Sequence, residues 1–235
     1  MIRFHRRFHP PKVISFDLDD TLYDNVPIIK RTEERTHSLI TERVPETREW
    51  DIEHWRQRRL DLMRRDDALA DNMTALRRAT LLQGFRELEI DDADTVTDEI
   101  MDAFLAFRSD FSVSEEVHDL LDQLASRYSL VAVSNGNADV KRVGIGHYFK
   151  LALQPTHDLR GKPNTDMFEY VKQAMNCAPE AILHVGDSPQ SDVFGAQRAG
   201  MQSVWLTSGL GRSHQLRVLP TVTIDDLQEL SALLL

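Results

Sequence analysis

The sequence predicts an α/β protein with a doubly wound, mostly parallel β-sheet and an inserted bundle of helices. Six short apolar or β-branched runs, each bounded by turn or polar residues, have the character of strands buried on both faces. These runs are VISFDL, LVAVSN, LALQPT, AILHVGD, SVWLT and TVTI. Helical patterns separate several of them: SEEVHDLLDQLASRY, NTDMFEYVKQAMN and QSDVFGAQRAG. Because strands alternate with helices, right-handed crossovers and a Rossmann-like sheet are expected.

The helices between the strands carry start and stop signals. Ser112 or Ser114 can cap the first of them, since a serine side chain accepts a hydrogen bond from an N–H of the first turn. Gly200 can end the last one, because glycine readily adopts the left-handed conformation that often follows a helix. These signals support the assignment of three crossover helices.

The segment 25–108 differs from the rest of the chain, because it shows mainly helical periodicity and no convincing strand. Pro27 suits the first turn of a helix, and Asn25 can cap it. The simplest organisation is an α/β core domain formed by 1–24 and 109–235, with 25–108 as an inserted helical cap. Ligands of such sheets bind at the carboxyl ends of the strands, where the insertion leaves the core, so the cap is expected to act as a lid.

Composition excludes several classes of protein. The chain has 235 residues, 41% hydrophobic and 28% charged, with a net charge of −10. An acidic balance argues against nucleic-acid or membrane-surface binding. The basic start, MIRFHRRFHPPK, lacks the apolar region of a signal peptide. The single cysteine, Cys177, cannot form an intramolecular disulfide and fits a reducing compartment. We expect a cytoplasmic protein, monomeric or weakly homo-oligomeric.

The first predicted strand runs into four aspartates, which are Asp17, Asp19, Asp20 and Asp24. Alternation along the strand points Asp17 and Asp19 to the same side at its carboxyl end. Two carboxylates held together can share a hard cation such as Mg²⁺, which prefers oxygen ligands. The competing interpretation is that Asp19 and Asp20 only end the strand and stabilise a turn.

Three further segments place polar residues at or beyond strand ends. Ser134 and Asn135 end the run LVAVSN and can donate to a phosphate oxygen, although SNG turns are common. Lys162, between a glycine and a proline, can hold a positive charge near anions, although most lysines are solvated. Asp187 follows the run AILHVG and can supply a third carboxylate. Asp192 can accept a hydrogen bond from a metal-bound water or from Lys162. Alternatively, it is only a negative charge that stabilises the start of a helix.

These four segments, in this order, resemble the motifs of the haloacid dehalogenase (HAD) superfamily. The matching residues are Asp17 and Asp19 in DLDDT, Ser134, Lys162, and Asp187 and Asp192 in GDSPQSD. The resemblance covers the core, and the insertion is similar to that superfamily's cap. Asp19 favours a phosphatase or phosphomutase, because the superfamily's dehalogenases do not keep an aspartate two residues after the nucleophile.

The resemblance implies a role for each residue. Asp17 would be the nucleophile, forming an aspartyl-phosphate, and Asp19 the general acid/base. Mg²⁺ would be held by Asp17, the backbone carbonyl of Asp19, and Asp187. Ser134, Asn135 and Lys162 would bind the substrate phosphate. Asp192 would not bind the metal itself but would orient a metal-bound water or Lys162.

Longer runs of the chain resemble bacterial phosphatases that act on ribityl phosphates. These runs are FDLDDTLYDN, THSLI, VAVSNGNA, HVGD, GAQRAGMQSVW and RVLPTVTIDDLQEL. That resemblance implies action on 5-amino-6-(5-phospho-D-ribitylamino)uracil and FMN, in riboflavin and flavin metabolism. The alternatives are a pyrimidine nucleotide 5′-phosphatase, a sugar phosphomutase and a catalytically silent binding protein on the same fold.

Neither the cap nor the remaining histidines add a firm site residue. The spacing of the cap's aromatic residues favours a bundle core over a stacking platform; they are Trp50, Trp55, Phe85, Phe104 and Phe107. Its arginines are interleaved with aspartates, which favours a solvated face. The chain leaves the core at Tyr23, Asp24 and Asn25, which can serve as hinge or substrate-rim residues. His184, inside an apolar run, is interpreted as a satisfied interior residue rather than a catalyst.

Overall fold

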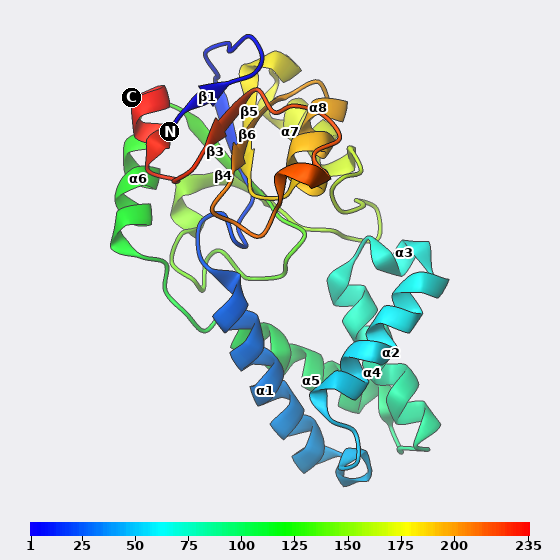
Figure 1. Ribbon diagram of the computed structural model, residues 1–235. Coiled ribbons are helices and arrows are strands. Elements are labelled where there is room, and N and C mark those ends of the chain that lie inside the picture. Colours follow the sequence, from blue (N-terminus) through cyan, green and yellow to red (C-terminus); the bar gives the residue numbers. More distant parts are fainter. The chain divides into compact units, whose positions relative to one another are not determined.

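The computed structural model describes all 235 residues and divides them into two compact units (Figure 1). The core unit contains residues 1–25, 112–136 and 140–235. The cap unit contains residues 26–111 together with 137–139. The expected domains, 1–24 with 109–235 and 25–108, remain a prediction about which segments fold as independent domains.

A seven-stranded sheet forms the centre of the core unit, and its strand order is β1-β7-β6-β5-β2-β3-β4. All neighbouring strands are parallel except β1, which pairs antiparallel with β7 at one edge. The strands are β1 (Arg3–Phe4), β2 (Val13–Phe16), β3 (Ser129–Val133), β4 (Phe149–Leu153), β5 (Ile182–Gly186), β6 (Gln202–Leu206) and β7 (Val222–Ile224). The six predicted strands are confirmed, and the mostly parallel α/β sheet with them.

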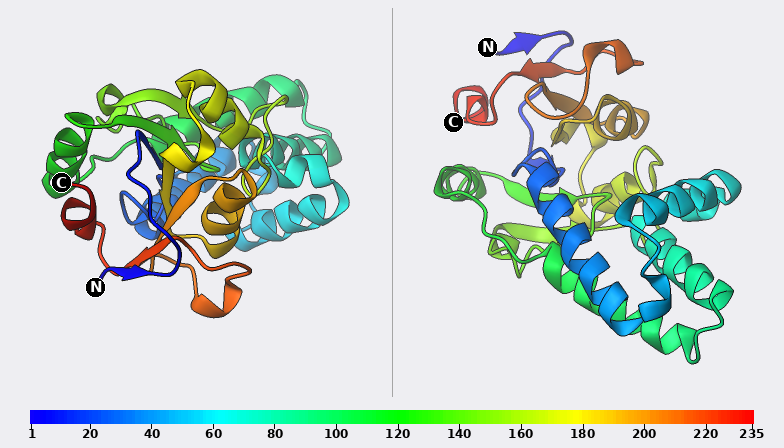
Figure 2. Two further views of the ribbon diagram at one scale, coloured as in Figure 1. Left: turned by 90° about the horizontal axis from the view of Figure 1, so that it is seen from above. Right: turned by 60° about the horizontal axis from the view of Figure 1, so that its bottom comes forward.

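Helices cover both faces of this sheet. In the view from above, α6 (Glu115–Ala125) and α9 (Glu229–Leu234) lie on one side, and α7 (Asp166–Met175) and α8 (Gly195–Arg198) on the other (Figure 2). A buried apolar cluster joins the strands to α7 and α8, and its members include Val131, Val133, Met167, Phe168, Ile182 and Ala196. Since both faces are covered, the central strands are apolar throughout, as their sequences indicated.

The ends of the helices differ in detail from the prediction. Ser114 precedes α6, but its side chain makes no capping hydrogen bond. The predicted helix QSDVFGAQRAG begins as a π-helical segment, Pro189–Phe194, and becomes α-helical only in α8. Gly200 has a φ of +78°, so it ends the helix in the left-handed conformation as predicted.

The cap unit is helical. It contains α1 (Asn25–Arg43), α2 (Ile52–Arg65), α3 (Asp67–Ala70), α4 (Met73–Glu87) and α5 (Ala93–Arg108). Most of the cap's aromatic residues lie in its core, as the spacing predicted: Trp55, Phe85 and Phe104 are buried. A Cβ at Gly84 would lie 2.8 Å from the Trp55 ring, so only glycine allows α4 to approach this ring so closely.

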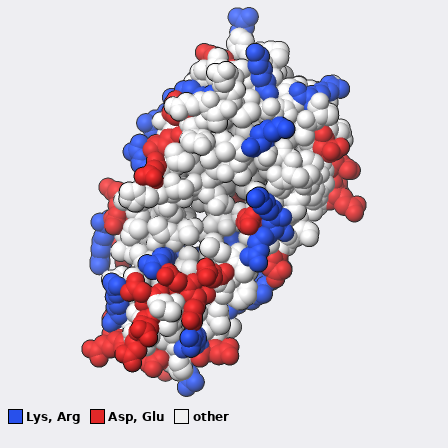
Figure 3. Space-filling view, turned by 180° about the vertical axis from the view of Figure 1, so that it is seen from behind, with Lys and Arg blue, Asp and Glu red and all other residues white.

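The surface carries charges of both signs. Acidic and basic side chains are interspersed on the face seen in Figure 3, and no continuous basic field covers it. None of the helices combines the length and the apolar character that a membrane span requires.

Candidate active site

Three buried carboxylates gather at the carboxyl end of the central strands. Asp17 follows β2 and Asp187 follows β5, which are adjacent parallel strands, so the two chains leave the sheet at the same edge. Asp192 lies one helical turn further along, in the π-helical segment. One carboxylate oxygen from each lies within 4.8 Å of the others. Proximity of three like charges is costly unless cations share the site.

Lys162 supplies one positive charge to this cluster. Its Nζ donates to Asp17 Oδ1 at 2.7 Å and to Asp192 Oδ1 at 2.6 Å, and its side chain is only 1% exposed. The flanking loop is held by Asn135, whose side-chain oxygen accepts from Lys162 N and whose Nδ2 donates to Lys162 O, both at 2.7 Å. Asn135 therefore positions Lys162, and only its second N–H is left for the predicted contact with phosphate.

A buried histidine orients Asp192. His184 on β5 and Ser15 on β2 face each other in register, with 2.9 Å between His184 Nδ1 and Ser15 Oγ. His184 Nε2 lies 3.1 Å from Asp192 Oδ1, and Asp192 Oδ2 accepts from the backbone N of Ser188. Burial lowers the pKa of His184, which favours a neutral ring that donates to Asp192 and accepts from Ser15. The interpretation of His184 as a satisfied interior residue is confirmed.

Asp192 is better placed to brace Lys162 than to bind a metal directly. Burial opposes its ionised form, but Lys162 and His184 hold the pKa of Asp192 well below its usual value. Both of its oxygens already accept hydrogen bonds from the protein. This arrangement supports the expectation that Asp192 contacts Lys162 rather than the metal itself.

Asp19 lies two residues after the predicted nucleophile. Its Oδ1 accepts from the Tyr23 hydroxyl at 2.8 Å. A Cβ at Gly136 would lie 2.3 Å from Asp19 Oδ2, so the turn after Ser134 must be glycine to pass the carboxylate. Ser134 Oγ accepts from the Gly136 N–H at 3.0 Å. Ser134 and Asp19 thus approach the same turn from β3 and β2.

Of the two remaining aspartates of the opening cluster, Asp20 lies in a turn and Asp24 directly precedes α1. Asp20 has a φ of 59°, and its Oδ1 accepts from the backbone N of Asn25 at 3.0 Å. Asp20 therefore stabilises the start of α1, and Asn25 is the first residue of that helix rather than its cap. The competing turn interpretation is correct for Asp20.

A loop near the C-terminus packs tightly on Asp187. Leu210 N donates to Asp187 Oδ2 at 2.9 Å, and Trp205 Nε1 donates to Asp187 O at 2.8 Å. A Cβ at Gly209 would lie 2.2 Å from Asp187 Cβ, and one at Gly211 would lie 2.3 Å from Asp187 O. Sequence reasoning missed this loop, and its only local signal was the pair of glycines in SGLG.

The electrostatics of the cluster favour a bound divalent cation. Burial raises the pKa of Asp187 to about 6, with a contribution from the nearby Asp192. Burial also raises the pKa of Asp17 to about 8, against the opposing effect of Lys162. One ammonium group does not balance three carboxylates, and all the donors are hard oxygens, so the residues fit Mg²⁺. Asp17 and Asp187 are the side chains that would hold it, with the backbone carbonyl of Asp19 as a predicted third ligand.

The fold and this cluster define a class of hydrolase that works at the carboxyl ends of a parallel sheet. The family model described as haloacid dehalogenase-like hydrolase matches residues 11–200. The chain belongs to this family, and its similarity to the phosphatase described next makes it a phosphatase.

The chain is similar over nearly its whole length to one curated phosphatase and to one solved structure. The 5-amino-6-(5-phospho-D-ribitylamino)uracil phosphatase YigB of Escherichia coli is 33% identical, over 99% of this chain and 100% of that protein. The pyrimidine 5′-nucleotidase YjjG of the same organism is 31% identical, over 49% of this chain and 53% of that protein. A solved structure described as a 2-haloacid dehalogenase, from Pseudomonas syringae, superposes with a TM-score of 0.86 at 33% identity, covering 95% of this chain and 98% of that one.

Proposed function

We propose that this protein is a Mg²⁺-dependent phosphatase of small phosphate monoesters, working through an aspartyl-phosphate intermediate. The observation that carries the proposal is the contact of Lys162 with both Asp17 and Asp192 beside Asp187. A buried carboxylate held by an ammonium group at a strand end is suited to in-line attack on phosphorus.

The chain's own residues account for both half-reactions. An Asp17 oxygen attacks the phosphorus, the ester P–O bond breaks, and Asp19 gives its proton to the departing alcohol. In the second half, Asp19 takes a proton from water, the water oxygen attacks the phosphorus, and the bond to Asp17 breaks to release phosphate. Tyr23, which donates to Asp19, fixes the orientation of that carboxyl group. Lys162 and Ser134 bind the phosphoryl oxygens, and bound Mg²⁺ would neutralise part of their charge.

The proposed substrates are ribityl phosphates, namely 5-amino-6-(5-phospho-D-ribitylamino)uracil and FMN. Support comes from the similarity to YigB, which extends over the full length of both chains and so includes the cap, where specificity is expected to lie. The similarity to the nucleotidase YjjG covers only about half of each chain. A pyrimidine nucleotide phosphatase is therefore the second candidate. A place in riboflavin metabolism and a cytoplasmic location belong to this same proposal.

A substrate panel tests the proposal. The purified protein is given FMN, the ribitylaminouracil phosphate, nucleoside monophosphates and small sugar phosphates, with and without Mg²⁺, and kcat/KM is measured for each. We expect the ribityl phosphates to be preferred and Asp17→Asn to abolish turnover of all of them. A preference for nucleoside monophosphates would replace the substrate and keep the chemistry. No turnover of any monoester with Mg²⁺ present would overturn the mechanism.

A further inference from the structure

The orientation of the Asp187 carboxylate depends on one backbone N–H from the loop after β6. Asp187 is only 7% exposed, and its Oδ2 accepts from the N–H of Leu210 at 2.9 Å. Trp205, in β6, donates to the main-chain carbonyl of Asp187 and so holds its backbone, not its side chain. The position of the Leu210 N–H therefore determines how the carboxylate is turned towards a cation.

The loop that carries this N–H has no regular structure to keep it in place. The strand β6 ends at Leu206, and the next helical segment is the single 3₁₀ turn Ser213–Gln215. The carbonyls of residues 209–211 accept no hydrogen bond from a backbone N–H. Another group must hold the loop in the conformation that presents Leu210 to Asp187.

The side chain of Arg212 is that group. Its Nη1 donates to three successive carbonyls, those of Gly209 at 3.1 Å, Leu210 at 2.8 Å and Gly211 at 3.0 Å. Because Nη1 carries two N–H groups, one of them is shared between two acceptors. None of the contacts of this guanidinium group is with a carboxylate, so its charge is directed at the loop.

One of these carbonyls belongs to the peptide group that contacts Asp187. The oxygen of Gly209 and the N–H of Leu210 are the two ends of a single trans peptide group. A trans peptide points its C=O and N–H in opposite directions. The guanidinium group thus binds one end of this peptide group and the carboxylate the other. A cation at the oxygen also polarises the amide, which strengthens the hydrogen bond that its N–H donates.

The backbone of Arg212 is itself anchored. Its N–H donates to Gln215 Oε1 at 2.8 Å, and the N–H of Gln215 donates back to the carbonyl of Arg212 at 2.9 Å. The side chain therefore folds back over the loop from a fixed position at the start of the 3₁₀ turn.

We propose that Arg212 is a positioning residue for the metal site. Its guanidinium group holds the peptide group between Gly209 and Leu210 with the N–H towards Asp187, and the affinity for Mg²⁺ depends on this contact. Arg212 lies on the surface and acts only through the peptide group. The inference rests on the proposed function in one respect, which is the binding of Mg²⁺ by Asp187.

Calorimetric titration of the full chain with Mg²⁺, without substrate, tests the role of Arg212. Arg212→Gln should raise the dissociation constant for Mg²⁺ about fivefold, less than for a direct partner of a metal ligand, because Arg212 is exposed and acts through a peptide group. Arg212→Lys keeps the charge and should recover part of the affinity. Arg217→Gln is the matched control, since this exposed arginine of the same segment lies over the ring of Phe194 instead.

Hydrogen exchange at the Leu210 amide examines the same contact without metal or substrate. In Arg212→Gln the Leu210 N–H should exchange about fivefold faster than in the wild type, because its hydrogen bond to Asp187 opens more often. The amides of β5 should exchange as in the wild type, which shows that the fold is intact. Arg217→Gln should leave exchange at Leu210 unchanged.

The two measurements separate failure of this inference from failure of the proposed function. Unchanged Mg²⁺ affinity in Arg212→Gln, or unchanged exchange at Leu210, overturns the role of Arg212 and leaves the phosphatase proposal standing. A raised substrate KM with an unaltered Mg²⁺ dissociation constant does the same, because it assigns Arg212 to the substrate. No Mg²⁺ binding by the wild type overturns the Mg²⁺ dependence of the proposed function, and the role of Arg212 with it.

Discussion

In the candidate active site, two carboxylates share the ammonium group of Lys162. Lys162 can keep both contacts only while Asp192 is fixed, and His184 Nε2 and the backbone N–H of Ser188 fix it. The chain from Ser15 through His184 and Asp192 to Lys162 is buried throughout. A charge whose neighbours are fixed loses little energy to reorganisation during a reaction, so we expect His184 to act as a positioning residue.

Replacing His184 tests this role. His184→Phe should lower kcat about ten- to a hundredfold with little change in KM, because Asp192 loses a donor and Lys162 loses its alignment. His184→Gln, which can still donate to Asp192, should restore part of the loss. The measurement is steady-state kinetics on a generic phosphate monoester at several pH values. His157→Phe is the control, since that side chain is 99% exposed. Equal kcat in His184→Phe and wild type would contradict the positioning role.

At the scale of single elements, close backbone approach shapes the site as much as the charged side chains do. The loop after β6 packs its glycines against Asp187, and the turn after β3 passes Asp19 at Gly136. Neither approach can be deduced from local sequence, because each depends on a residue from a distant strand. The motif residues were predictable, since Asp17, Ser134 and Asp187 directly follow strands that apolar runs mark, and Lys162 lies shortly before a helix that its periodicity marks.

Gly209→Ala tests the contribution of the loop. The added Cβ would lie 2.2 Å from Asp187 Cβ, so the loop or the aspartate must move. We expect the Mg²⁺ concentration needed for half-maximal activity to rise about tenfold, as for other changes next to metal ligands. Titration of activity with Mg²⁺ gives this value directly. Ser208→Ala, an exposed neighbour in the same loop, should behave as wild type. An unchanged Mg²⁺ requirement in Gly209→Ala would show that the loop does not position Asp187.

At the scale of the whole molecule, metal binding, protonation and stability are linked. The pKa of Asp187 is raised to about 6 from its usual 3.8. A carboxyl group with a raised pKa contributes stability below pH 3.8, and this contribution is lost as pH rises through about 6. A cation that binds the ionised carboxylates compensates for that loss and stabilises the folded state.

The increase in Tm caused by saturating Mg²⁺ should therefore be small at pH 5 and grow as pH rises through about 6 towards 8, where Asp17 also ionises. The lowered pKa of His184 acts in the opposite direction with or without metal, so it largely cancels in the difference. Thermal denaturation across this pH range measures the effect. Asp187→Asn should remove it, and Asp158→Asn, 92% exposed, should not. A Mg²⁺ effect independent of pH would argue against Asp187 as a ligand.

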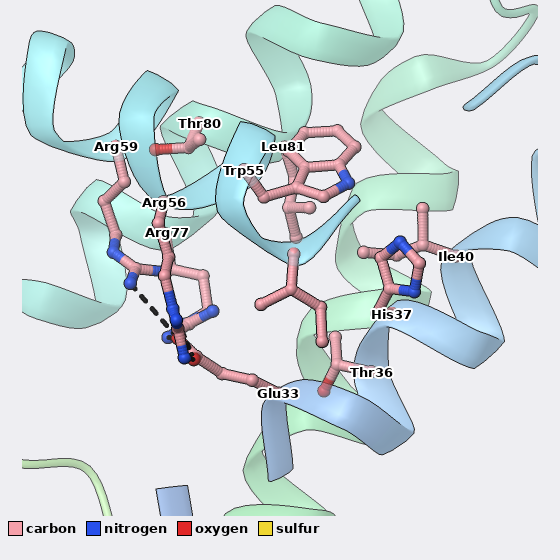
Figure 4. A pocket seen from close by; sticks show the side chains of 11 residues that line it. Glu33, Thr36, His37, Ile40, Trp55, Arg56, Arg59, Arg77, Thr80 and Leu81 are labelled. Carbon is pink, nitrogen blue, oxygen red and sulfur yellow. Dashed lines mark hydrogen bonds and ion pairs between the residues drawn. The ribbon is translucent and has the colours of Figure 1, made fainter. Parts of the chain in front are cut away.

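The parts of the molecule that sequence could not predict are those that depend on long-range pairing. The edge strand β1 lies in a basic segment with no strand pattern of its own and forms only because β7 offers its edge. Arg59 and Arg77 each stand next to another arginine in the sequence, which indicates a surface position, yet both pair with Glu33 on another helix (Figure 4) and are only 22% and 15% exposed. In the sequence, Ser15 and His184 are isolated polar residues in apolar runs. Only the pairing of β2 with β5 shows that they contact each other.

The position of β2 in the sheet has a consequence for how the chain is made. This strand is formed from residues near the N-terminus, yet its two neighbours, β3 and β5, both come after the whole cap segment. During synthesis, the apolar β2 segment therefore has no neighbouring strand to pair with until the cap and β3 have emerged from the ribosome. The cap's helices, whose packing partners lie close in sequence, can form earlier and shorten the distance over which β2 must find β3. The insertion thus bears on the order of assembly of the core.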